Sequence, residues 1–211
     1  MLAWGFNAVG QLGNGTTHDS DAPVPVTLPT GTTVAGIAAG DLHSLALTST
    51  GQVLAWGFGL QGELGNGTFN SSDTPVMAML PLGTTVRQLS AGCEHTLALT
   101  STGQVLAWGF NADGQLGNDS TQDSDVPVMA GLPQDTVATE VSAGCNHSLA
   151  LTSSGHVLAW GRNDDGELGN ASTVSSDVPV QVNLPATVTP VATGAGPVGS
   201  VSFAIVHKAA A

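Results

Sequence analysis

Three histidines recur at one position of a repeated sequence, and their side chains have the clearest capacity for chemistry. His43, His95 and His147 each begin the run His-[Ser/Thr]-Leu-Ala-Leu-Thr, at intervals of 52 residues. Imidazole is a common metal ligand, so three rings around one axis could bind a metal ion. The alternative is structural: each ring bonds to the backbone of its own or the next repeat and fixes a turn. We favour this second role, and we predict no metal ion and no cofactor.

Two cysteines stand beside these histidines. Cys93 and Cys145 each lie two residues before a repeated His, and Asp41 holds the matching position of the first repeat. A spacing of 52 residues is not that of a zinc site. A disulfide would need Cα atoms within about 7 Å, a distance that neighbouring repeats could reach only near a shared axis. We expect two small, mostly buried thiols, and the sequence leaves both their pairing and the redox compartment open.

A ring of acidic residues is the candidate interaction face. One Asp precedes the Pro of each repeated Ser-Asp-x-Pro-Val by two residues: Asp21, Asp73, Asp125 and Asp177. Together with Asp19 and Asp123, these side chains could give one face a negative field that steers a basic protein partner. The alternative is solvation, in which acidic side chains keep an apolar repeat soluble.

The charge balance excludes two classes of partner. The 211 residues include 3 Lys and Arg against 16 Asp and Glu, for a formal net charge of -13. Three cations cannot line a groove that follows nucleic acid phosphates, so we predict no nucleic acid partner. They cannot dock the chain on anionic lipid either, and no run of 18 apolar residues occurs, so we predict no membrane association.

No constellation of unlike polar residues suggests an enzyme. A catalytic site needs different side chains converging at one place, which breaks the symmetry of a repeat. Here almost every polar residue has copies at the same repeat position. We therefore predict a protein without catalytic residues.

The elements that position these side chains follow one period. The tetrapeptide Leu-Ala-Trp-Gly occurs four times at 52-residue intervals, around Trp4, Trp56, Trp108 and Trp160, and Ser-Asp-x-Pro-Val keeps the same interval. Repeats at such a period indicate a solenoid or a propeller. We divide the chain into one array, residues 1–211, with repeats at about 1–52, 53–104, 105–156 and 157–211.

Within a repeat the pattern is that of strands. In residues 53–104 the apolar runs are 53–57, 76–80, 86–89 and 97–100, and a Gly-containing turn at 101–104 leads into the next run. No window carries a helical stripe with caps. Four short strands per repeat fit one blade of an all-β β-propeller, with four blades per chain. We expect Ala-Gly pairs such as Ala91-Gly92 near the axis, and each Trp in the gap between neighbouring blades.

The motifs also resemble a known family. Trp-Gly-x-Asn-x-x-Gly-Gln-Leu-Gly at 108–117, followed by Pro-Val and by Ala-Gly-x-x-His-[Ser/Thr]-Leu-Ala-Leu-Thr, resembles the regulator of chromosome condensation repeat. The resemblance implies a propeller, usually of seven blades, that acts as an interaction platform. Relatives include exchange factors for a small nuclear GTPase, ubiquitin-ligase modules, a plant ultraviolet receptor and bacterial inhibitors of secreted enzymes.

The two ends of the chain are incomplete in complementary ways. The sequence starts inside a hairpin unit, and its last repeat is divergent: Gly199 holds the His position in strict register, and Val201 holds it after a shift of two. We predict that the closing strand 201–206 pairs with the N-terminal strand as a clasp, which removes sheet edges. Three outcomes stay open: a closed four-bladed monomer, an eight-bladed homodimer, and a piece of a longer array. We favour the homodimer, because family-type repeats should prefer the shallow blade angle of a larger ring.

The predicted function is that of a non-catalytic protein-interaction scaffold. A self-assembling structural propeller, or a designed or duplicated repeat module without a separate ligand, is one alternative. A small-ligand binder in the central channel is the other. The sequence leaves the localisation undetermined, with a lean towards an extracellular bacterial protein from its few Lys and many Thr, Ser, Gly and Asn. It also leaves open whether the chain is natural, a fragment or engineered.

Overall fold

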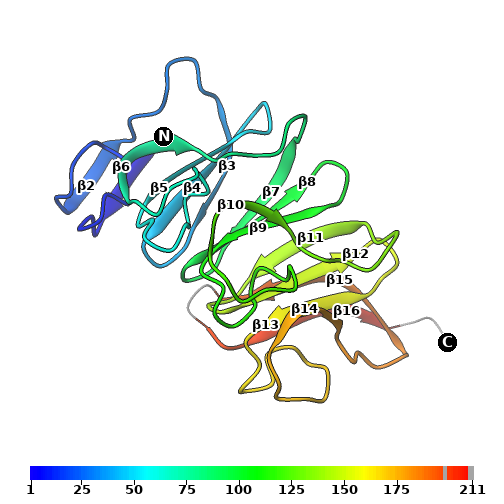
Figure 1. Ribbon diagram of the computed structural model, residues 1–211. Coiled ribbons are helices and arrows are strands. Elements are labelled where there is room, and N and C mark those ends of the chain that lie inside the picture. Colours follow the sequence, from blue (N-terminus) through cyan, green and yellow to red (C-terminus); the bar gives the residue numbers. More distant parts are fainter. Residues whose placement is uncertain (197–198, 209–211) are drawn as a thin grey trace.

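The chain forms a row of small antiparallel sheets. The structure is a computed structural model, and it describes residues 1–196 and 199–208. Sixteen strands make five sheets in this part of the chain, and no helix occurs among these residues (Figure 1). No helix that could cross a membrane is therefore found in the described ranges. The all-β prediction is confirmed.

Three sheets are complete four-stranded blades, and within each the strands pair in sequence order. Blade 1 contains β3 (Val34–Ala39), β4 (His43–Thr48), β5 (Val53–Gly57) and β6 (Ser72–Met77). Blade 2 contains β7 (Val86–Ala91), β8 (His95–Thr100), β9 (Val105–Gly109) and β10 (Ser124–Met129). Blade 3 contains β11 (Ala138–Ala143), β12 (His147–Thr152), β13 (Val157–Gly161) and β14 (Ser176–Gln181).

The burial of each strand in a blade explains which residue types it contains. The Val-Leu-Ala-Trp-Gly strands β5, β9 and β13 are buried at every residue, because both faces of the sheet are covered by neighbouring blades. The Pro of each outer strand, such as Pro75 in β6, lies on an edge strand, where a missing N–H costs no ladder bond. The outer strand of blade 1 begins at Ser72, four residues before the predicted start at Val76.

A half-blade of two strands stands at each end of the row. The N-terminal half-blade pairs β1 (Leu2–Gly5) with β2 (Ser20–Pro25), which match the outer two strands of a blade. The C-terminal half-blade pairs β15 (Val188–Ala195) with β16 (Ser202–Lys208), which match the inner two.

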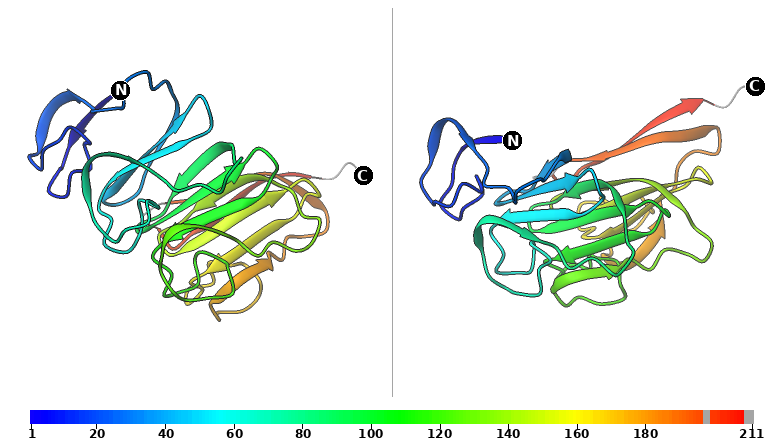
Figure 2. Two further views of the ribbon diagram at one scale, coloured as in Figure 1. Left: turned by 45° about the horizontal axis from the view of Figure 1, so that its top comes forward. Right: turned by 90° about the horizontal axis from the view of Figure 1, so that it is seen from above.

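The two half-blades do not join. The predicted clasp between the terminal strands of one chain is not formed in the described residues, since β1–β2 and β15–β16 are separate sheets. Figures 1 and 2 show them at opposite ends of the row, with the three blades between them. The prediction that the terminal strands of one chain pair with each other is therefore wrong for the described residues. The angle between successive blades is too small for this row of sheets to bring its own two ends together.

The core lies between blades and is built around tryptophan. Trp56, Trp108 and Trp160 have no exposed surface, and each packs with Val, Leu and Ala side chains of two adjacent blades. Trp4 is 64% exposed. The prediction that every Trp fills a gap between blades is wrong for Trp4, because no blade formed by the described residues covers it.

Candidate functional site

The repeated His takes part in a relay of hydrogen bonds across each seam between blades. At the seam of blades 1 and 2, His43 Nε2 lies 3.1 Å from Thr96 Oγ1. The Thr96 hydroxyl donates to the Glu63 carbonyl oxygen at 3.2 Å, and Trp108 Nε1 donates to the same oxygen at 2.8 Å. Because the hydroxyl has one hydrogen and gives it to Glu63, His43 must donate from Nε2.

The same relay recurs at the next seam. His95 Nε2 lies 3.0 Å from Ser148 Oγ, which donates to the Gln115 carbonyl at 2.8 Å. Trp160 Nε1 donates to that carbonyl at 2.9 Å. The partner of the ring is thus a side-chain hydroxyl of the next blade, whereas the sequence analysis expected a backbone group. The hydroxyl residue after each His is a member of the seam that sequence reasoning missed, although its recurrence as Ser or Thr was visible.

Burial keeps these rings neutral. Desolvation lowers the pKa of His43 to about 4, and it lowers the pKa of His95 to about 3 with a further contribution from the two neighbouring histidines. The pKa of His147 is also lowered by burial. Among the described residues, no group of three or more His, Cys, Asp and Glu side chains could hold a metal ion.

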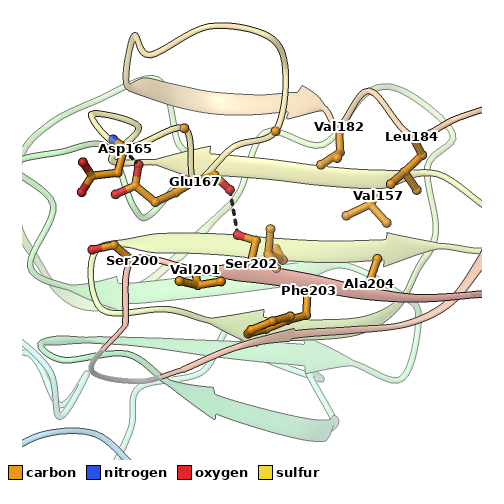
Figure 3. A pocket seen from close by; sticks show the side chains of 13 residues that line it. Val157, Asp165, Glu167, Val182, Leu184, Ser200, Val201, Ser202, Phe203 and Ala204 are labelled. Atoms are coloured by element: carbon orange, nitrogen blue, oxygen red, sulfur yellow. Dashed lines mark hydrogen bonds between the residues drawn. The ribbon is translucent and has the colours of Figure 1, made fainter.

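At the last seam the relay is only partly filled. His147 Nε2 lies 2.9 Å from Ser202 Oγ, which donates to the Glu167 carbonyl at 2.7 Å, and no Trp reaches that carbonyl within the described residues. A pocket of about 350 Å³ opens there between blade 3 and β16 (Figure 3). Its lining includes Gly169, Val182 and Ala204. Ser202 matches Ser148 of the blade before, so Val201 takes the His position, as the shifted register predicts.

Backbone bonds join the blades near the axis. The N–H of Asp41 donates to the Cys93 carbonyl at 3.3 Å, and the N–H of Cys93 donates to the Cys145 carbonyl at 3.2 Å. The N–H of Cys145 continues the series to the Gly199 carbonyl at 3.3 Å. The Ala-Gly pairs make this approach possible: a Cβ built on Gly92 would lie 2.4 Å from the Gly144 carbonyl oxygen.

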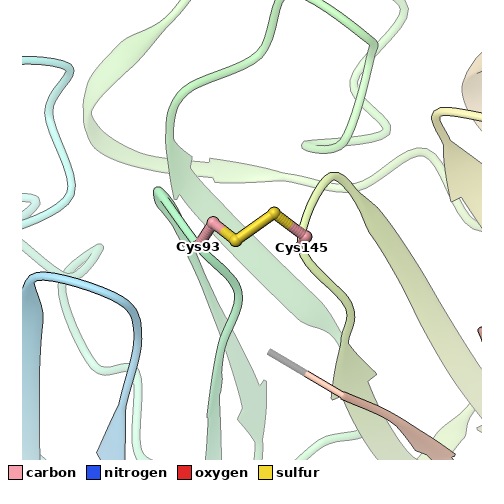
Figure 4. The surroundings of a disulfide bond; sticks show 2 residues. All are labelled: Cys93 and Cys145. Atoms are coloured by element: carbon pink, nitrogen blue, oxygen red, sulfur yellow. A yellow bond between two sulfur atoms is a disulfide. The ribbon is translucent and has the colours of Figure 1, made fainter. Parts of the chain in front are cut away.

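The same approach brings the two cysteines together. Cys93 and Cys145 form a disulfide between blades 2 and 3, with 4.5 Å between their Cα atoms (Figure 4). The expectation of two separate thiols was wrong. Equivalent positions of adjacent blades lie within disulfide reach here, which the spacing of 52 residues could not show.

Strand direction gathers acidic residues at one end of the blades. In blade 1, the start of β4 pairs with the end of β5 and the start of β6, so the 40–42 turn and the 58–71 loop lie at the same end. We call this end, with its counterparts in the other repeats, the loop face. It carries these exposed or half-buried acidic residues: Asp19, Asp41, Glu94, Asp113, Asp119, Asp123, Asp164 and Asp165.

Cations are sparse on the loop face. Arg162 lies there and pairs with Asp164 at 3.0 Å. Arg87 bonds to the carbonyls of Thr100, Ala138 and Thr139 at the opposite end of the strands. Burial raises the pKa of Glu94, and the negative charges of Asp41 and Asp123 raise it further, so these carboxylates share one field.

The four predicted acidic positions lie beside this face, at the second residue of each outer strand. Asp21 is exposed, whereas Asp73, Asp125 and Asp177 are half-buried at the seams. Each of these three accepts a backbone bond from the preceding repeat through its carbonyl, such as Gly67 N to Asp125 O at 2.8 Å.

Buried asparagines organise the loops, a role that the sequence analysis did not assign to them. Asn111 has no exposed surface; its Nδ2 donates to the carbonyls of Ser120 and Gln122, and its Oδ1 accepts from Leu116 N. Asn7 and Asn163 make the equivalent bonds, and Gly59 replaces them in the second repeat. Their recurrence after Trp-Gly was the available signal.

Comparison with known proteins identifies relatives of the whole chain. A family model described as an RCC1-like domain matches residues 1–209. The Ultraviolet-B receptor UVR8 of Arabidopsis thaliana is 33% identical over 179 residues, covering 85% of this chain and 41% of the receptor. The human E3 ubiquitin-protein ligase HERC2 is 34% identical over 176 residues, covering 82% of this chain and 4% of the ligase. The chain thus spans less than half of either relative.

Solved structures share the fold. Human WBSCR16 superposes with a TM-score of 0.82 at 25% identity, over 99% of this chain and 53% of that one. Yeast RCC1 (Prp20), in a structure with Kap60 bound, superposes with a TM-score of 0.78 at 25% identity, over 97% of this chain and 49% of that one. In both cases the row of blades corresponds to about half of the solved chain.

Proposed function

Because the chain belongs to the family of RCC1-like domains, we propose that it is a non-catalytic propeller module that binds a basic protein partner on its loop face. The observation that carries the proposal is the concentration of acidic side chains at one end of the strands, together with a net charge of -13. A field of one sign speeds the encounter with a partner of the opposite sign and fixes its orientation.

The use of polar side chains within the repeat supports a binding role rather than catalysis. The repeated His, Ser or Thr, Trp and Asn are engaged in hydrogen bonds that hold blades and loops in place. Rigid sheets that present variable loops are a common arrangement for recognition.

The relatives are consistent with such a role. They include a receptor, a ubiquitin ligase of which the matched stretch is a small part, and a yeast protein that was solved with Kap60 bound. Domains of one fold can serve different activities, so the partner must be sought from the chemistry of the loop face of this chain.

The test is salt-dependent binding of an oligoarginine peptide, measured by fluorescence anisotropy. We expect binding that weakens as ionic strength rises from about 0.1 M to about 1 M. The variant Asp113→Asn/Asp165→Asn removes two loop-face charges and should weaken binding roughly threefold per charge.

The matched control is Asp135→Asn/Glu140→Gln, which removes two charges near the opposite end of the strands. It should bind the peptide like the parent chain. Equal losses in the two variants would show attraction by net charge alone and would overturn the loop face as the site.

A further inference from the structure

The pocket beside β16 is lined like the three sites that hold the buried Trp56, Trp108 and Trp160, which we call tryptophan sockets. In the filled sockets, a Gly with φ near +65° lies beneath the indole: a Cβ built on Gly117 would be 2.7 Å from Trp160 Nε1, and Gly13 and Gly65 lie equally close to Trp56 and Trp108. Gly169 has the same backbone conformation, with φ of +58°, and no indole lies over it.

The apolar walls match as well. Trp160 packs in one cluster with Val105, Ala130 and Ala150, with Leu132 against them. The corresponding side chains of the next repeat line the pocket: Val157, Val182 and Leu184, each 52 residues later, and Ala204, 54 residues after Ala150 (Figure 3). The Glu167 carbonyl corresponds to the Gln115 carbonyl, which accepts a hydrogen bond from Trp160. It already accepts one hydrogen bond, from the Ser202 hydroxyl.

The opposite end of the row carries the missing side chain. Trp4 occupies the same repeat position as the three buried tryptophans, yet it is 64% exposed. Leu2 and Phe6 beside it are also exposed, at 57% and 58%. An apolar cluster of this kind on a soluble protein marks an interaction surface.

The sheet edges are complementary in register. In the complete blades, the Ser or Thr after the His pairs with Trp, as in Ser148 with Trp160 and Ser44 with Trp56. If β1 joined β16 in this register, Ser202 would face Trp4, and Phe203 would face Ala3. The sheet order would then be β15-β16-β1-β2, a complete blade, and two unpaired edges would be removed.

We propose that Trp4 of a second copy of this chain fills the socket beside β16, so that two copies close head to tail into an eight-bladed ring. Each interface joins β1 of one copy to β16 of the other, and the twofold symmetry of the dimer produces this interface twice. The inference goes beyond the binding of a basic partner and does not depend on it.

Two observations favour a second copy over other occupants. The ends of one chain lie at opposite ends of its row (Figure 2), and one row corresponds to about half of a solved relative, 53% of WBSCR16.

The first test is the mass in solution, measured by sedimentation or light scattering. We expect twice the 21.0 kDa of one chain. The variant Trp4→Ala should weaken self-association by roughly 30-fold or more, as expected for an aromatic anchor at the centre of an interface. Ala204→Phe should act in the same way, because the new ring occupies the socket.

The control is Leu82→Ala, which truncates a fully exposed apolar side chain on a connector far from the two edges. It should leave the mass unchanged. A monomer at all concentrations would overturn the proposal, and so would a dimer that survives both Trp4→Ala and Ala204→Phe. An open polymer would overturn the two-chain ring.

The second test reads the register directly. The variant Ala3→Cys/Phe203→Cys places two thiols opposite each other, where Cα atoms of paired strands are about 4.5–5.5 Å apart. We expect a covalent dimer on a non-reducing gel, and no such band for Ala3→Cys/Ile205→Cys, whose thiols lie two residues out of register. Equal cross-linking in both variants would contradict the pairing of β1 with β16. Circular dichroism of each variant checks that the blades still fold.

Discussion

Trp108 Nε1 and Thr96 Oγ1 donate to one acceptor, the carbonyl oxygen of Glu63 in the preceding blade, at 2.8 and 3.2 Å. Both donor side chains have no exposed surface, and the Thr96 hydroxyl also accepts a hydrogen bond from His43 Nε2. A single backbone oxygen therefore connects the second and third strands of blade 2, β8 and β9, to a loop of the preceding blade. The angle between blades depends on this shared acceptor.

Thr96→Val should destabilise the protein by about 2–4 kcal/mol, because it removes two hydrogen bonds and leaves the buried His43 donor without a partner. Chemical denaturation measures the change in the free energy of unfolding. The control Thr121→Val alters an exposed loop position and should stay within about 0.5 kcal/mol of the parent chain. Equal stability of Thr96→Val and the parent would argue against the relay.

Gly92→Ala tests the close approach of the blades near the axis. The added Cβ would lie 2.3 Å from His95 Cε1 and 2.4 Å from the Gly144 carbonyl oxygen, and the latter is backbone that cannot move aside. We expect a loss of at least about 3 kcal/mol, seen as a lower melting temperature. Gly194→Ala is the matched control, since nothing lies within 4 Å of a Cβ there.

Reduction of the Cys93–Cys145 disulfide should lower stability by roughly 4 kcal/mol, from the loop-closure entropy of a 52-residue separation. Denaturant midpoints with and without reductant measure this loss. The double variant Cys93→Ala/Cys145→Ala should match the reduced protein and should not respond to reductant. Two reactive thiols per chain in the denatured, unreduced protein would contradict the bond.

Glu63 should make stability fall as the pH rises. Burial raises the pKa of Glu63 from 4.5 to about 7, with smaller contributions from the charges of Glu94 and Asp123. Because its pKa in the folded state lies above that in the unfolded state, ionisation between about pH 4.5 and pH 7 favours unfolding, by up to about 3 kcal/mol. Glu63→Gln should therefore stabilise the protein at pH 8 and change little at pH 4.5.

The converse substitution is available at the next seam along the row. Gln115 holds the matching position and is buried like Glu63, so Gln115→Glu should add a similar loss of stability at high pH. Unfolding free energies at the two pH values measure both variants. Parallel pH profiles for Glu63→Gln, Gln115→Glu and the parent would contradict the burial of these carboxyl groups.

The period and the apolar runs were sufficient to predict the blades. Strands around Trp56 and Trp108 were predicted at their observed bounds, because a five-residue run buried on both faces leaves few alternatives. The outer strand was predicted to begin at Val76, since Ser72 to Thr74 carry no apolar pattern; they join the sheet through their backbone.

Features that depend on the angle between blades could not be read from the sequence. The Cys93–Cys145 bond and the hydrogen bond from His43 to Thr96 join residues 52 and 53 positions apart, and a change of a few ångströms between blades would break either. Trp4 shows the same limit. Its local sequence equals that of Trp56, but Trp56 is covered by a neighbouring sheet and Trp4 is not covered by any sheet of the described residues.

The position of the disulfide in the row has a mechanical consequence. Repeat arrays fray from their termini, and each unit is held mainly by its neighbours. The bridge fastens blade 2 to blade 3, so blade 1 with the N-terminal half-blade can peel away while the fastened pair stays intact. Under tension or limited proteolysis of a single chain, the parts outside the bridge should be lost first and leave blades 2 and 3 as the resistant remnant.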